Sequence, residues 1–79
     1  MKTYEETLEM MRPAYNEMME AADRTAAHYD QLGWDDSLTI KAAHSEEVKA
    51  HRFIGMCESI GFMYEKHWMD VYREVADNG

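Results

Sequence analysis

The amino-acid sequence predicts an all-α protein built as a helical hairpin of two long antiparallel helices. Hydrophobic residues recur every three or four positions along most of the chain, and capping residues stand at the start of each half. Eight Met, five Tyr and two Trp bring the hydrophobic fraction to 46%, which supports folding although Leu, Ile, Val and Phe are scarce. Because a chain this short buries only about 60% of the surface that its unfolded form exposes, we expect one marginally stable domain over residues 1–79.

The first helix is predicted over residues 3–32. Thr3 and Glu6 have the spacing of a capping box, in which each side chain accepts a hydrogen bond from the other residue's backbone N–H. Gly33 is placed to end the helix as a C-terminal cap. One hydrophobic stripe, in alternating steps of four and three, consists of Tyr4, Leu8, Met11, Tyr15, Met18, Ala22, Thr25, Tyr29 and Leu32.

Pro13 lies within this predicted helix, where it removes one hydrogen bond and its ring clashes with the carbonyl of Glu9. Since the stripe keeps its phase across Pro13, we expect a kinked helix. The alternative is a helix broken at Pro13, with a short arm over residues 3–11 and a new helix that has Pro13 in its first turn.

A turn over residues 33–37 precedes a helical second half, residues 37–77. Asp35, Asp36 and Ser37 are all competent N-caps, and Ser45 is a further candidate. The second half is therefore either one long helix, or a short helix near 37–44 that runs into a long one from 45 to about 77. Its core stripe consists of Phe53, Cys57, Ile60, Tyr64, His67, Val71 and Val75.

Further hydrophobic residues widen this second stripe on both sides, beyond what one antiparallel neighbour can cover. Self-association into a four-helix bundle or a larger homo-oligomer would cover it, and we expect a dimer. The residues expected at this oligomer interface are Met56, Ile60, Met63, Tyr64, Trp68 and Tyr72.

Other hydrophobic residues lie off both stripes, and we expect them to face a protein partner rather than the core. They are Met10, Met19, Trp34, Phe62 and Met69. Acidic side chains add to this surface: residues 1–36 carry 9 acids and 3 bases, and Glu17 and Glu20 could present carboxylates to a basic groove. The simpler interpretation of both features is an ordinary, solvated helix surface.

Composition argues against several classes of function. A net charge of −8 opposes binding to anionic lipid or directly to nucleic acid, and no stretch is apolar enough to span a membrane. The single Cys57 permits no internal disulfide and indicates a reducing, cytoplasmic setting. The sequence has no phosphate-binding loop, serine triad or zinc-type cysteine cluster, so we expect no enzyme and no cofactor.

A weak metal-binding pattern occurs in the second half. His44, Glu47 and His51 lie at i, i+3 and i+7, which puts three possible ligands on one side of a helix. The Glu-x-x-His spacing of di-iron bundles and the His-Glu-x-x-His motif are both missing. A solvated, charged face therefore explains these residues better, and the prediction is that no metal is bound.

These features favour a small acidic binding protein that inhibits or regulates a larger protein, for example by occupying a nucleic-acid-binding surface. Small size, methionine content and acidity are shared by many phage-encoded inhibitors of host defence, including anti-CRISPR proteins, which act in the host cytoplasm. This is a similarity of class, carried by no residue motif.

The alternative function is an oligomeric hairpin that binds and sequesters a small anionic nucleotide. The run of residues 58–63 is similar to the second helix of phage hairpin proteins that sequester cyclic nucleotides. Under this interpretation Lys49, Arg52, Lys66 and Arg73 would bind the nucleotide, together with the stacking rings of tyrosines.

Overall fold

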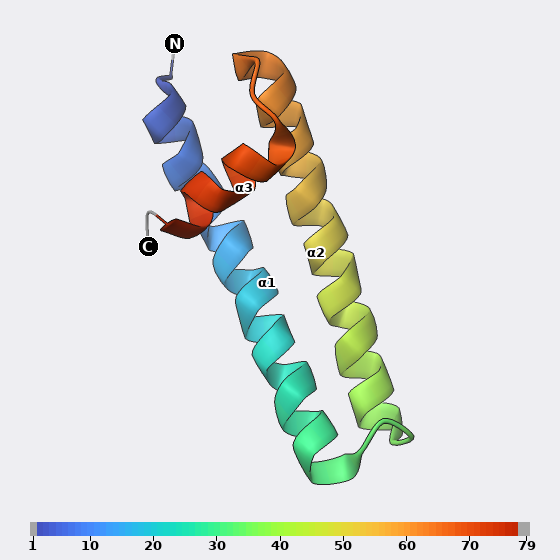
Figure 1. Ribbon diagram of the computed structural model, residues 1–79. Helices are drawn as coiled ribbons and strands as arrows, with labels where there is room; N and C mark the ends of the chain where they lie inside the picture. The colour runs from blue at the N-terminus through green and yellow to red at the C-terminus, as the bar shows by residue number, and fades with distance from the viewer. Residues whose placement is uncertain (1, 78–79) are drawn as a thin grey trace.

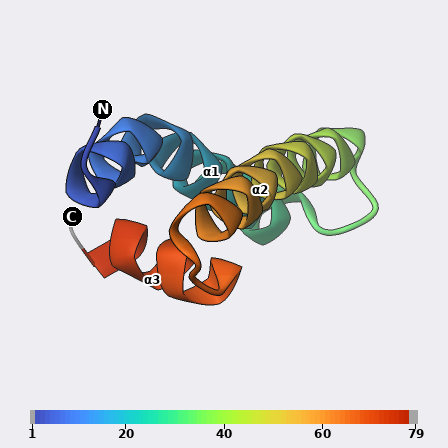
Figure 2. The same cartoon turned by 90° about the horizontal axis from the view of Figure 1, so that it is seen from above.

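The computed structural model describes residues 2–77, and within them it contains three helices and no strand. Helix α1 spans Tyr4–Leu32, α2 spans Ser37–Tyr64 and α3 spans Trp68–Asp77 (Figure 1). The first two are antiparallel, and α3 crosses them on one side, near the start of α1 and the end of α2 (Figure 2). The all-helical class is confirmed, whereas the prediction of two helices has to be corrected, because a third, short helix follows the two long ones.

Helix α1 begins and ends at the predicted residues. The Thr3 side chain accepts from the Glu6 backbone N–H at 3.2 Å, and the Glu6 side chain accepts from the Thr3 N–H at 3.1 Å, which lowers the pKa of Glu6. At the other end Gly33 has a φ of 81°, which favours glycine, and its N–H donates to the Tyr29 carbonyl.

Pro13 does not break α1. The helix runs without interruption from Tyr4 to Leu32, and Pro13 lies on its exposed side. The alternative of a short arm over residues 3–11 followed by a new helix is therefore wrong, because packing of residues on both sides of Pro13 against the same core holds the helix together.

Helix α2 is a single helix from Ser37. Asp36 is its N-cap, since the side chain accepts from the Leu38 backbone N–H at 2.8 Å. Ser45 lies inside the helix, so the separate short helix near 37–44 does not form.

The chain turns sharply after Tyr64, and a helix continuous to residue 77 was the wrong prediction. Glu65 adopts the left-handed conformation, and the Lys66 N–H donates to the Gly61 carbonyl at 2.8 Å. Gly61 permits this turn, because a Cβ there would lie 2.5 Å from the backbone oxygen of Lys66. His67, expected on the apolar stripe, is exposed instead, and its Nδ1 accepts from the Met69 N–H at the start of α3.

The core lies where the three helices meet. Phe53, Cys57, Val71 and Val75 have no exposed surface. The core cluster also contains Leu8, Met11 and Met18 of α1, with Tyr4, Ala14, Tyr15, Ala50, Met56, Ile60, Trp68 and Tyr72 packed around it. We call residues 2–20 with 50–77 the three-helix end and residues 21–49 the two-helix end.

Hydrogen bonds connect α3 to α1. The Tyr4 hydroxyl donates to the Glu74 carboxylate, and Arg12 donates to the backbone carbonyl of Val75 near the end of α3. The Lys66 ammonium lies 3.3 Å from Glu74 and 4.3 Å from the centre of the Tyr4 ring. Burial and the contact with Glu74 raise the pKa of Tyr4, and the same contact lowers the pKa of Glu74.

Within residues 2–77, none of the helices has the length and hydrophobicity needed to cross a membrane.

Candidate binding surface

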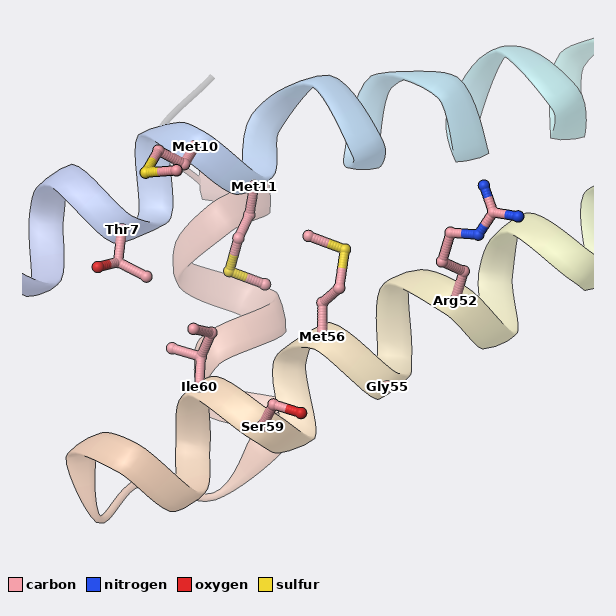
Figure 3. Close-up of a pocket in the computed structure, with 8 residues that line it drawn as sticks. All are labelled: Thr7, Met10, Met11, Arg52, Gly55, Met56, Ser59 and Ile60. Atoms are coloured by element: carbon pink, nitrogen blue, oxygen red, sulfur yellow. The ribbon is translucent and has the colours of Figure 1, made fainter.

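An apolar groove lies between α1 and α2 at the three-helix end. It has a volume of about 470 Å³ and is lined by Thr7, Met10, Met11, Arg52, Gly55, Met56, Ser59 and Ile60. The side chains of Met11, Met56 and Ile60 point toward one another between the helices, Met10 lies along α1, and Arg52 lies at one end (Figure 3). Arg52 is the only charged residue in this lining.

Both walls of the groove have exposed parts. Met10 is 59% exposed, although its neighbour Met11 is fully packed in the core. Gly55 is exposed on the opposite wall, and apart from its two chain neighbours and the backbone of its own helix nothing lies within 4 Å of where its Cβ would be. The groove therefore offers soft, apolar side chains and a depression that a neighbouring molecule could fill.

The exposed apolar surface continues toward the end of α2. Phe62 is 89% exposed and Met63 is 68% exposed. They follow Ser59 by three and four residues, so both are its neighbours on the helix surface. Scattered single apolar residues are normal on a protein surface, but an adjacent Phe and Met beside an apolar groove make a candidate protein-binding site.

A second apolar hollow lies between α2 and α3. It has a volume of about 300 Å³ and is lined by Ile54, Trp68, Met69, Tyr72 and Arg73. The one cation in this lining, Arg73, already has an acidic partner, because its guanidinium lies 3.8 Å from the Asp70 carboxylate.

The five hydrophobic residues expected to face a partner are all exposed, but they do not form one patch. Met10 lies in the groove, Met69 in the second hollow and Phe62 at the end of α2. Trp34 lies in the turn at the far end of a molecule 47 Å long, where its ring packs 4.6 Å from that of Tyr29. Met19 is exposed elsewhere on α1, as are the two acidic residues Glu17 and Glu20.

The residues expected at an oligomer interface lie mostly within the fold of one chain. Met56, Ile60, Trp68 and Tyr72 pack partly buried against the core cluster, and the Tyr64 hydroxyl is 3.2 Å from that of Thr7. Met63 alone among them is largely exposed. The wide hydrophobic arc of the second half is thus covered in part by α3. Burial of these residues therefore needs a second copy less than the hairpin prediction implied.

The four cations proposed for a nucleotide site are not brought together. Lys66 is engaged by Glu74 and Tyr4, and Arg73 by Asp70. Lys49 and Arg52 lie on α2, with Arg52 at the groove and Arg73 at the other hollow.

The groups with chemical reactivity are isolated or packed away. Cys57 has no exposed surface, and burial raises the pKa of its thiol to about 11, which leaves it protonated and unreactive at neutral pH. No group of three or more His, Cys, Asp or Glu within residues 2–77 is placed to hold a metal ion, and this includes His44, Glu47 and His51.

The features that sequence reasoning missed depend on contacts between distant parts of the chain. Tyr4 and Glu74 are 70 residues apart, and no local pattern relates them. Gly55 did carry a signal, because a glycine inside a helix weakens it and usually has a packing reason.

No protein-family model matches this chain, and no curated protein or solved structure proved similar to it. Function therefore has to be argued from the surface described above.

Proposed function

We propose that this chain is a small binding protein without catalytic activity that inhibits or regulates a larger protein. The observation that carries the proposal is the exposure of Phe62, at 89%, next to the exposed Met63 and the apolar groove. Phe is among the residues enriched in the buried cores of protein interfaces, and Met adapts to irregular partners. Contact with a partner would remove this apolar surface from water.

Charge supports a basic partner surface. The chain carries −8 overall, and Glu17 and Glu20 are exposed on α1. Such a surface speeds association with a basic groove and would compete there with nucleic acid. A phage-type inhibitor of host defence, acting in the cytoplasm and similar in class to anti-CRISPR proteins, is the kind of protein that combines these properties.

We also propose that the chain acts as a homo-oligomer, with a dimer that forms a four-helix arrangement from the α1 and α2 helices of two copies. The exposed groove between α1 and α2 supports this, because each helix pair of a four-helix bundle buries one face against the other pair.

The experiment is affinity capture with the wild-type chain, Phe62→Ser and the control Ile40→Ser. Ile40 is a matched control because it is 56% exposed but lies at the two-helix end. We expect the wild-type and Ile40→Ser chains to retain the same protein, and Phe62→Ser to bind it at least about tenfold more weakly, since a buried aromatic anchor is worth that much or more.

The captured protein is then purified, and its activity is measured with and without each variant. Equal binding and equal inhibition by Phe62→Ser and wild-type chains would contradict the proposal. Glu20→Lys should slow association most strongly at low salt, because a rim charge mainly changes the association rate.

A further inference from the structure

We propose that the groove between α1 and α2 is filled by the same groove of a second copy, in a two-fold dimer in which α1 of each copy packs over α2 of the other. This inference specifies the oligomer proposed above, and it does not depend on the identity of the larger partner protein.

The first observation is a second stripe on α2, about a third of a turn away from the core stripe. Its residues are spaced by three and four positions, the spacing of a helix-packing face: Lys41, Ser45, Val48, Arg52, Gly55 and Ser59. All of them except Ser45 are exposed. The stripe contains no acid, in a chain with 16 acidic and 8 basic residues.

A matching stripe borders the groove on α1. It contains Thr7, Met10, Ala14, Glu17 and Ala21 at the same alternating spacing. Ala14 leaves room for a neighbouring helix, whereas Ala21 is already buried within its own chain. Met10 and Glu17 extend outward as exposed side chains. In each copy, the charged residue of the α1 stripe is therefore an acid, and the charged residues of the α2 stripe are all cations.

Contacts within the chain fix which residues of α1 and α2 lie at the same level. The Tyr15 and Phe53 rings are 5.6 Å apart, and the Thr7 and Tyr64 hydroxyls are 3.2 Å apart. Counting along the antiparallel helices from these pairs puts Glu17 level with Arg52.

A two-fold axis parallel to the helices keeps every residue at its level and exchanges α1 with α2 across the interface. Glu17 of one copy then lies opposite Arg52 of the other, and this pair forms twice. Within residues 2–77 of one chain Arg52 makes no ion pair, so this cation is available. Charge complementarity thus favours a second copy in spite of the net charge of −8.

The same arrangement accounts for Gly55. By the same count, Ala14 of one copy comes to the level of Gly55 of the other, where the missing side chain leaves open space. Two small residues at one level let the two helices approach closely, which a larger side chain at residue 55 would prevent. Without a neighbour at this point, an exposed glycine would only weaken α2.

The test is light scattering coupled to size exclusion, over a range of concentrations, on the wild-type chain, Gly55→Leu and the control Glu47→Leu, at an exposed α2 residue that is not three or four residues from any residue of the stripe. A Cβ at residue 55 meets no neighbouring side chain, and leucine improves helix propensity, so we expect the variant to keep its fold, which circular dichroism verifies. We expect a wild-type dimer, a dimer of Glu47→Leu, and at least about a tenfold higher dissociation constant for Gly55→Leu because of overpacking at the interface. A wild-type monomer throughout, or an unchanged dissociation constant in Gly55→Leu, would overturn the proposal.

Charge exchange tests the arrangement of the two copies. Arg52→Glu and Glu17→Arg should each weaken the dimer, because like charges then face each other, and the double variant should restore it. If both single variants lost the dimer and the double variant did not restore it, this arrangement would be contradicted. Because Phe62 follows Ser59 by three residues and borders this interface, the mass of Phe62→Ser is measured as well. A Phe62→Ser dimer of unchanged stability that no longer captures the larger protein assigns the loss to the partner-binding surface and not to the dimer.

Discussion

The two ends of this molecule use the same pair of helices but are built differently. At the three-helix end, α3 lies across α1 and α2, and four side chains, those of Phe53, Cys57, Val71 and Val75, are removed entirely from water. At the two-helix end, the buried residues are only Ala21, Thr25 and Thr39. Large hydrophobic side chains remain exposed there, namely Tyr29, Leu32, Trp34, Leu38, Ile40 and Val48.

The difference shows what one additional layer contributes. Two helices have only one contact line between them, and small residues such as Ala21 suffice to fill it. A short amphipathic third helix creates an enclosed volume in which aromatic side chains can be buried. We therefore expect stability to be concentrated at the three-helix end, with the two-helix end opening more easily.

Phe53→Ala should have the largest effect. The Phe53 ring is fully buried, with the Tyr15 and Tyr72 rings 5.6 and 5.3 Å away, so its removal leaves a cavity among all three helices. We expect a loss of about 3–5 kcal/mol in the free energy of unfolding, measured by urea denaturation followed by circular dichroism. Leu38→Ala, at the exposed start of α2, should cost less than about 0.5 kcal/mol, and a similar loss in both variants would remove the contrast between the ends.

Gly61→Ala should come next, because it acts on the turn that returns α3 to the core. The added Cβ would collide with the Lys66 backbone oxygen, which cannot move away as a flexible side chain could. We expect about 1–3 kcal/mol of destabilisation in urea, typical of overpacking. Gly55→Ala is the matched control, measured together with Gly61→Ala at a dilution where the chain is a monomer. It should instead stabilise α2, because its Cβ meets no neighbouring side chain. Stabilisation by both substitutions would show that the turn after Tyr64 does not form.

Thr39→Val should strengthen the two-helix end. Thr39 has no exposed surface, and within the described chain its hydroxyl lacks a hydrogen-bond partner. Valine keeps the branched shape and removes the unsatisfied group, so we expect a gain of about 1 kcal/mol in thermal or urea unfolding. Thr25→Val serves as the control, because the Thr25 hydroxyl already donates to the Ala21 carbonyl. An equal gain from both would argue against the unsatisfied hydroxyl as the cause.

The smallest effect should be a pH dependence of the free energy of unfolding, and it should originate at the three-helix end. The hydrogen bond from Tyr4, together with Lys66, holds the pKa of Glu74 below its usual value of 4.5. A lowered folded-state pKa stabilises the fold above the unfolded-state pKa, and this contribution is lost as the pH falls through the folded-state value. Because Glu74 is partly exposed, we expect less than about 1 kcal/mol.

Unfolding measured from neutral pH to below the pKa of Glu74 checks this expectation. Glu74→Gln should reduce the loss of stability on acidification, whereas Glu58→Gln, on the exposed side of α2, should leave it unchanged. Glu6, whose pKa is also lowered, has the same sign and accounts for part of the remaining dependence in every variant. If Glu74→Gln followed the wild-type curve, the contact with Tyr4 would have no energetic role.

Local signals in the sequence were enough to predict α1 and the first turn. The Thr3–Glu6 spacing, the hydrophobic stripe and Gly33 each depend on neighbours a few residues away. The structure agrees with both caps and with the stripe as far as Thr25, whereas the last members, Tyr29 and Leu32, are exposed. The end of α2 could not be predicted in this way. Residues 64–68 contain no proline, glycine or usual N-cap residue, and Val71 and Val75 keep the helical phase because they face the same core from α3.

The candidate surface was predictable only in part. Position relative to the hydrophobic stripes correctly indicated exposure for Met10 and Phe62, because exposure depends mainly on which face of a helix a residue occupies. The distribution of these residues over separate sites depends on how the helices pack. Trp34 lies far from Phe62 because nearly the whole length of α2 separates them. Trp68 packs against the core because α3 returns to it.

The burial of Cys57 gives this protein a chemical reporter of its own motion. It is the single thiol of the chain, and it lies at the centre of the core cluster under α3. A thiol reagent can reach its Sγ only when the three-helix end opens, so the rate of modification counts those openings. Labelling of the unmodified sequence thus measures how often α3 leaves the core, under native conditions and without an introduced probe.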